Sequence, residues 1–224
     1  MLWEGTVNKK EKKERMALIV ERLKGIYPSA ECALEYGGDP WRLLVMARLS
    51  AQCTDARVNI VSRELFEVFP TVRAMADGEL SEIERIVKPC GLYRMKAKNI
   101  KDCAEIVLSE YAGRIPDTMD ELLRLPGVGR KIANLLLGDI YGQPAIVCDT
   151  HCIRICGRLG MYPESERDPT KIEKILRGLM DITEGSDFCH RIVIFGREVC
   201  SARSPACNCC PLLDICEHNR RGGV

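Results

Sequence analysis

The sequence lacks any apolar run near the roughly 18 residues that a membrane-spanning helix needs. It also lacks an excess of either charge, because 33 lysines and arginines face 32 aspartates and glutamates, a net charge of +1. This balance excludes a globally basic nucleic-acid binder but leaves room for a local basic face. The first residues are rich in lysine and glutamate and contain no apolar core of a secretory signal peptide, so we expect a cytoplasmic protein.

Alternating strand patterns are nearly absent, and only residues 144–148 suit a short extended piece. Apolar residues instead recur at helical spacing, most clearly over residues 55–69 and 94–113, where each segment presents one apolar face. With 224 residues and 46% hydrophobic content, the chain is long enough for one or two packed cores. The sequence therefore predicts an all-α protein.

Helix starts are marked by polar residues at capping positions. Ser81 with Glu84, and Thr118 with Glu121, have the spacing of capping boxes. Asp168-Pro169 is typical of an N-cap followed by a first-turn proline. We expect a helix to begin at each of these three places.

Thirteen cysteines are unusual in a chain without an export signal, and their odd number argues against a disulfide framework. Nine of them are scattered, mostly beside apolar residues, and we expect small buried core side chains. These are Cys32, Cys53, Cys90, Cys103, Cys148, Cys152, Cys156, Cys189 and Cys209.

The remaining cysteines, Cys200, Cys207, Cys210 and Cys216, have the spacing C-x6-C-x2-C-x5-C. Four thiolates within one short loop suit a single metal centre, either zinc or an iron–sulfur cluster. Structural zinc usually pairs two short Cys-x2–4-Cys knuckles, so the asymmetric spacing favours an iron–sulfur cluster. Cys209 could replace a ligand, but the spacing favours its neighbour Cys210.

A glycine-rich turn joins two helical segments at residues 125–131, Leu-Pro-Gly-Val-Gly-Arg-Lys. Gly127 and Gly129 permit tight backbone geometry and close approach of a ligand. The turn also leaves amide N–H groups at the start of a helix, where they suit a phosphate. A turn of this kind alone is equally typical of a purely structural helical hairpin.

Two cations follow this turn, although the helix dipole disfavours a cation in the first turn by about 0.3–1 kcal/mol. Arg130 could meet a phosphate, and Lys131 could act as a nucleophile if its amine is unprotonated. The dipole contributes less than one pKa unit, about 1.36 kcal/mol, so desolvation in a pocket must supply most of the activation. The alternative is a phosphate-binding or solvated lysine.

Asp149 follows the apolar residues 145–148 and precedes a helical segment. Capping of that helix is the simplest interpretation, with the helix amides holding the carboxylate ionised. An ionised carboxylate near a reactive lysine could also stabilise positive charge on a sugar ring.

A basic stretch without intervening acid contains Arg94, Lys96, Lys98 and Lys101. These side chains could bind phosphates, or they could form a solvated helix face.

Together, these motifs resemble the endonuclease III family of DNA repair glycosylases over about residues 16–218. The residues that carry the resemblance are 49–55 (Leu-Ser-Ala-Gln-Cys-Thr-Asp), 91–93 (Gly-Leu-Tyr), 125–131, 147–151 (Val-Cys-Asp-Thr-His), Gly196-Arg197 and the four spaced cysteines.

The resemblance implies a two-lobed, all-α helix-hairpin-helix fold with a DNA cleft. A six-helix barrel would span residues 33–143 and contain the helix-hairpin-helix at about 118–141. The second lobe would combine residues 1–32 and 144–224, with a [4Fe-4S] cluster on the four cysteines of loop 200–216.

The resemblance also implies a bifunctional DNA N-glycosylase and abasic-site lyase of base excision repair that removes oxidised or damaged pyrimidines. Lys131 would attack C1′ to form a Schiff base, Asp149 would assist, and β-elimination would cleave the strand 3′ to the abasic site. Gln52 would fill the space left by the flipped base and Leu92 would wedge into the stack, although a helix-surface glutamine and a core leucine are the simpler interpretations. The partner would be double-stranded DNA with a damaged base or abasic site, bound by a monomer at the nucleoid.

Two other functions stay open at this point. A monofunctional mismatch glycosylase would share the hairpin and cluster but lack a lysine at position 131. A non-catalytic iron–sulfur DNA-binding module would need neither Lys131 nor Asp149, and the presence of both argues against it.

Overall fold

The computed structural model describes residues 8–220 and residue 222. All regular secondary structure in this part of the chain is helical, which confirms the all-α prediction. Residues 144–148, the one segment that suited a short extended piece, have no regular secondary structure. No helix in the described ranges is both long and apolar enough to span a membrane.

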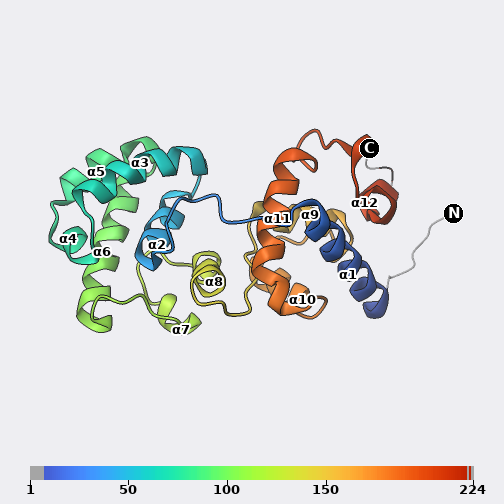
Figure 1. The fold of residues 1–224 in the computed structure, drawn as a ribbon, viewed down its shortest axis with the longest axis horizontal. Coiled ribbons are helices and arrows are strands. Elements are labelled where there is room, and N and C mark those ends of the chain that lie inside the picture. Colours follow the sequence, from blue (N-terminus) through green and yellow to red (C-terminus); the bar gives the residue numbers. More distant parts are fainter. Residues whose placement is uncertain (1–7, 221, 223–224) are drawn as a thin grey trace. The chain divides into compact units, whose positions relative to one another are not determined.

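The chain divides into two compact units (Figure 1). Unit 1 comprises Met1–Glu31 and Gln143–Val224, and unit 2 comprises Cys32–Gly142. These boundaries lie one residue from those expected for the two lobes. Unit 1 is thus built from both ends of the sequence, with unit 2 inserted between them.

Unit 2 is organised around one long helix, α6, which packs against α4 and α5, while α2 packs against α8. The helices of this unit are α2 (Pro40–Leu49), α3 (Asp55–Val68), α4 (Val72–Asp77), α5 (Leu80–Val87), α6 (Tyr93–Tyr111), α7 (Met119–Leu122) and α8 (Arg130–Asp139). A 3₁₀ turn, Lys88–Cys90, connects α5 to the residues before α6. The helices predicted at 55–69 and 94–113 are therefore confirmed as α3 and α6.

In unit 1, α11 packs against both α1 and α9. Its helices are α1 (Lys9–Ile26), α9 (Thr150–Arg158), α10 (Pro169–Arg177), α11 (Gly185–Glu198) and α12 (Glu217–Arg220). Three 3₁₀ turns, Ile182–Glu184, Cys207–Cys209 and Leu213–Ile215, complete the unit. An ion pair of 3.1 Å between Arg15 Nη1 and Glu217 Oε2 joins the two ends of the chain.

Two of the three predicted helix starts are confirmed. Thr118 accepts a hydrogen bond from the backbone N–H of Glu121 at the start of α7, and Asp168 caps α10, whose first residue is Pro169. The prediction at Ser81 is wrong, because α5 begins at Leu80 and its N-cap residue makes no side-chain capping bond. Burial of the apolar face of α5 against α6, rather than a cap, sets this start.

Six of the nine scattered cysteines are buried, as predicted: Cys90, Cys103, Cys148, Cys152, Cys156 and Cys189. Cys32 and Cys53 are only half-buried, and Cys209 is exposed. None of the cysteines in the described residues forms a disulfide.

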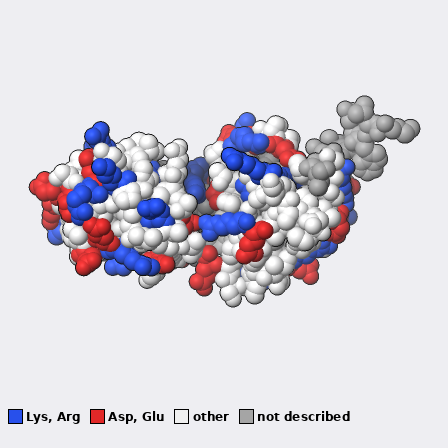
Figure 2. Space-filling model, turned by 90° about the horizontal axis from the view of Figure 1, so that it is seen from above, with Lys and Arg blue, Asp and Glu red and all other residues white. Residues whose placement is uncertain are grey.

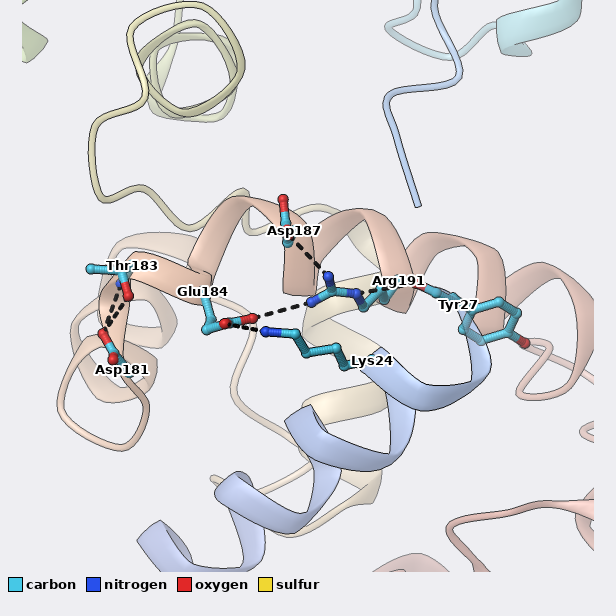
Figure 3. A network of polar contacts seen from close by, with 7 residues as sticks. All are labelled: Lys24, Tyr27, Asp181, Thr183, Glu184, Asp187 and Arg191. Carbon is cyan, nitrogen blue, oxygen red and sulfur yellow. Dashed lines mark hydrogen bonds and ion pairs between the residues drawn. The ribbon is translucent and has the colours of Figure 1, made fainter. Parts of the chain in front are cut away.

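A buried arginine joins α1 to α11 in unit 1 (Figure 3). Arg191 is 3% exposed and donates to Asp187 Oδ2 at 2.9 Å, to Glu184 Oε2 at 3.4 Å and to the carbonyl of Tyr27 at 3.2 Å. Lys24 of α1 binds the other oxygen of Glu184 at 2.6 Å, and this contact lowers the pKa of that carboxyl. The buried charge is tolerated because each of its nitrogens has an oxygen partner.

We expect Arg191→Met to lower the free energy of unfolding by about 1–3 kcal/mol, because it removes charge-assisted hydrogen bonds and leaves the Tyr27 carbonyl unpaired. The matched control is Arg63→Met. Arg63 pairs with Glu35 at 2.9 Å, but its side chain is 72% exposed, so its loss should cost less than about 1 kcal/mol. Urea unfolding followed by circular dichroism measures both, and equal losses would contradict the assigned role.

Candidate functional site

The predicted hairpin connects α7 to α8 in unit 2. Gly127 has a φ of +77°, and a Cβ there would lie 2.5 Å from Nε and 2.9 Å from Cδ of Arg48. Gly129 has a φ of −102°, and a Cβ there would meet nothing within 4 Å. The fold therefore requires glycine at the first position only.

Gly129 is instead the N-cap of α8 and makes no side-chain capping bond. The first N–H groups of a helix have no intrahelical partner. The missing side chain leaves open space beside them, so close approach of a ligand is what glycine permits at this position.

The two cations that follow occupy the first turn of α8. Arg130 is half-buried and Lys131 is exposed. On the face shown in Figure 2, basic and acidic side chains are interspersed, in keeping with the balanced total charge.

Asp149 is the N-cap of α9 in unit 1 and is half-buried. Its Oδ1 accepts a hydrogen bond of 2.8 Å from the backbone N–H of Cys152, which confirms the capping interpretation. The residues before it are anchored in the core, where the N–H of Val147 donates to Cys189 Sγ at 3.2 Å. The structure thus places Asp149 and Lys131 each within its own unit.

Gln52 and Leu92 both have left-handed backbone conformations, with φ of 56° and 48°. Such values are uncommon outside glycine and mark turns held by their surroundings. Gln52 is exposed in the turn between α2 and α3, and Leu92 is 52% exposed just before α6. The interpretations as a helix-surface glutamine and a core leucine are therefore both wrong.

The basic stretch on α6 is divided by the fold. Lys96 is completely buried and binds backbone carbonyls, and Lys101 binds the carbonyls of Ala76 and Gly78. Only Arg94 and Lys98 are exposed, so the stretch is neither a phosphate-binding row nor a solvated face. The spacing along the helix could have predicted the burial of Lys96, because it lies four residues before Ile100 and so shares the apolar face of α6.

Four cysteines of unit 1 surround one cavity. Cys200, Cys207, Cys210 and Cys216 all line it, together with apolar side chains of α9 and α11. Cys209 is exposed and does not line the cavity. The choice of Cys210 over Cys209 thus agrees with the positions of the two side chains.

Within residues 8–220 and 222, no three histidine, cysteine, aspartate or glutamate side chains converge on a point able to hold one metal ion. Two thiolates on a single tetrahedral zinc ion lie about 3.8 Å apart, given Zn–S bonds of about 2.3 Å. Four cysteine thiols around one cavity are a donor set for a metal centre, either zinc or an iron–sulfur cluster.

The groups around these thiols also suit an anionic sulfur site. Arg158 Nη1 lies 3.3 Å from Cys200 Sγ and donates to it, and hydrogen bonds to sulfur are a regular feature of iron–sulfur sites. The pKa of the Cys210 thiol is raised to about 11, mainly by burial and also by the three neighbouring cysteines, while a backbone hydrogen bond at Leu212 lowers it. A bound cationic centre would offset this cost of forming thiolates.

Comparison with known proteins decides the family. A family model described as HhH-GPD superfamily base excision DNA repair protein matches residues 45–181. Endonuclease III of Synechocystis sp. is 42% identical over 206 residues, which cover 92% of this chain and 93% of the relative. Endonuclease III of Bacillus subtilis is 38% identical over 208 residues, covering 93% and 94%. This chain belongs to the HhH-GPD superfamily.

Solved structures of endonuclease III bound to DNA are also similar to this HhH-GPD protein. A non-covalent endonuclease III–DNA complex matches with a TM-score of 0.89 and 38% identity, covering 94% of this chain and 98% of the other. A trapped endonuclease III–DNA covalent intermediate also matches with a TM-score of 0.89 and 38% identity, covering 95% and 99%. A thermostable thymine-DNA glycosylase, at 21% identity and a TM-score of 0.85, shares the fold.

The resemblance to the endonuclease III family is therefore confirmed, and with it the activity class, a DNA glycosylase and abasic-site lyase of base excision repair. The roles of individual residues stay predictions.

The two hairpin glycines provide a matched test. We expect Gly127→Ser to destabilise the protein by about 1–3 kcal/mol, because a side chain at positive φ is strained and would strike Arg48. Gly129→Ser should be neutral or slightly stabilising, since serine is a good N-cap, but it should weaken DNA binding. Thermal unfolding and fluorescence anisotropy with duplex DNA measure the two effects. Equal destabilisation by both variants would contradict this assignment.

Proposed function

We propose that this protein excises oxidised or ring-damaged pyrimidines from duplex DNA and then cleaves the strand, with Lys131 as nucleophile. The observation that carries the proposal is the exposed amine of Lys131 in the first turn of α8, directly after an open, glycine-lined hairpin. A side chain in this place can reach a sugar whose phosphate binds the same hairpin.

Binding of the DNA backbone would begin at the hairpin. The N–H groups at the start of α8 and the guanidinium of Arg130 would bind phosphate oxygens. These contacts fix the position of the backbone and carry no sequence preference. The target base has to leave the duplex, at a cost of a few kcal/mol of unstacking.

In the chemical step, Lys131 Nζ would form a bond to C1′ while the bond from C1′ to the base breaks, and the base leaves with the electron pair and takes up a proton. The amine must arrive unprotonated. Bound duplex would cover the exposed side chain and exclude water, which disfavours the ammonium form. The bound substrate would thus help to dehydrate the amine.

The secondary amine then becomes a Schiff base as the sugar ring opens. Loss of a proton from C2′ and cleavage of the C3′–O bond would complete β-elimination, with the phosphate as leaving group. Asp149 would stabilise the positive charge that develops on the sugar. Its capping bond to the N–H of Cys152 would hold the carboxylate in place during the reaction.

Gln52 would enter the space left by the extruded base, and Leu92 would enter the stack. Their exposure on two tight turns supports these roles, because neither side chain is needed to fill the core of unit 2. An apolar wedge partly repays the unstacking of the duplex.

The four cysteines that line the cavity would hold a [4Fe-4S] cluster. The cluster would cross-link loop 200–216, and base excision involves no net electron transfer, so its contribution is architectural. We further expect the protein to act as a monomer on nucleoid DNA that carries a damaged base or an abasic site.

Borohydride should trap the protein covalently on duplex DNA that contains thymine glycol or an abasic site, because it reduces a Schiff base to a stable amine. Lys131→Ala should abolish trapping while DNA affinity, measured by anisotropy, stays within about threefold. The control is Lys174→Ala, which removes another exposed lysine, on α10 of unit 1, and should trap as the wild type does. Trapping that persists in Lys131→Ala would exclude this residue as the nucleophile.

The cluster proposal is tested with adjacent cysteines. Protein purified without oxygen should be yellow-brown and contain about four iron atoms per chain. Cys210→Ser should lose most of this iron, whereas Cys209→Ser should keep it, because Cys210 lines the cavity and Cys209 does not. Iron analysis and visible absorbance provide the measurement. A colourless protein that contains only zinc would refute the cluster.

A further inference from the structure

A buried ammonium group lies beneath the two exposed turns of unit 2. Lys96 is 0% exposed, and its Nζ donates three hydrogen bonds of 2.8 Å, to the carbonyl oxygens of Leu49, Ala51 and Cys90. An ammonium group has three N–H donors, so every donor of this buried charge is used.

The three acceptors belong to the two turns that carry Gln52 and Leu92. Leu49 ends α2 and Ala51 directly precedes Gln52. Cys90 ends the 3₁₀ turn that leads into Gly91, whose φ is 68°, and Leu92. One side chain therefore ties together two turns whose sequence positions are about forty residues apart.

Both turns have conformations that their own residues do not favour. Left-handed backbone at a non-glycine residue costs of order 1–3 kcal/mol and persists only where the surroundings over-determine it. The hydrogen bonds of Lys96 supply that constraint on both turns at once. A shorter or apolar side chain would leave buried carbonyl groups unpaired and free the turns to move independently.

The next turn of α6 extends the connection to the hairpin. With its amide oxygen facing Arg48, Asn99 accepts hydrogen bonds from Nη2 at 2.8 Å and from Nε at 3.3 Å. The side chains of Arg48 and Asn99 are also the groups that a Cβ on Gly127 would strike. Lys96 and Asn99, three residues apart on one face of α6, thus contact all three turns proposed to bind DNA.

We propose that Lys96 is a positioning residue for base extrusion, and that its ammonium fixes the spacing of the Gln52 and Leu92 turns so that both side chains enter the duplex together. This inference rests on the proposed function. It assigns Lys96 no contact with DNA and no part in bond making.

The test compares the same abasic strand in duplex and single-stranded form. Lys96→Met keeps the length of the side chain and removes the donors. We expect its single-turnover rate of borohydride trapping to fall about tenfold or more on duplex, since small misplacements of reacting groups have effects of this size. On the single strand, where no helix has to be entered, the rate should change by less than about threefold.

A spectroscopic signal reports extrusion directly. A 2-aminopurine opposite the abasic site becomes more fluorescent when it unstacks. Wild-type protein should raise this fluorescence, and Lys96→Met should raise it much less at saturating protein. If Lys96 only stabilised the fold, its substitution would lower trapping on duplex and on single strand to the same extent.

The matched control is Lys101→Met on the same helix. Lys101 also binds backbone carbonyls, those of Ala76 and Gly78, but these lie at the C-terminal end of α4, which carries neither proposed inserting residue. The ratio of its trapping rate on duplex to that on single strand should match the wild-type ratio.

If Lys96→Met does not fold, Lys96→Gln, which keeps two N–H donors, replaces it in the same assays.

The outcomes separate the two proposals. If the wild type forms no borohydride-stable complex with either substrate, the proposed function fails. If the wild type is active and the Lys96 variants lose trapping equally on duplex and single strand, the positioning role is overturned. It is also overturned if their duplex to single-strand ratio of trapping rates equals that of Lys101→Met.

Discussion

The three hydrogen bonds of the buried Lys96 ammonium are the constraint on which the exposed turns of unit 2 depend. A charge inside a protein is tolerated only when its donors are satisfied, and here the acceptors are carbonyl groups of two separate turns. The charge and the turns are therefore coupled, because the same three hydrogen bonds satisfy the ammonium and connect the turns. The same helix, α6, also supplies the apolar face around which unit 2 is packed.

Unit 1 uses the same principle with arginine. Arg191 joins α1 to α11, and Arg158 donates to the carbonyls of Ser201 and Ala202 and to the thiol of Cys200. A guanidinium presents several N–H donors in a rigid fork, so it can hold a loop that has little regular structure. The loop of four cysteines is thereby fixed to α9, whose first residue directly follows Asp149.

The proposed nucleophile, Lys131, is an exposed residue of unit 2. If it acts as proposed, bound duplex has a chemical role beyond that of substrate, because it would help to exclude water from the amine. Such an enzyme stays unreactive until its substrate is in place, and a strand that fails to bind the hairpin would not activate the amine.

The sequence by itself determined the local features of this protein. Apolar periodicity predicted α3 and α6, the polar residues Thr118 and Asp168 predicted two helix starts, and the spacing of four cysteines distinguished Cys210 from Cys209. The linear motifs also sufficed for the family. These features depend on neighbouring residues, which a sequence displays directly.

Only the tertiary structure decided the rest. Ser81 has the chemistry of a cap but lies inside α5, because burial of an apolar face set the start of that helix. Lys96 was grouped with its basic neighbours, Leu92 was open to interpretation as core, and Gly129 looked equivalent to Gly127. In each case the answer depends on which other element covers that side of the residue. Packing between segments far apart in the chain determines this, and no local pattern encodes it.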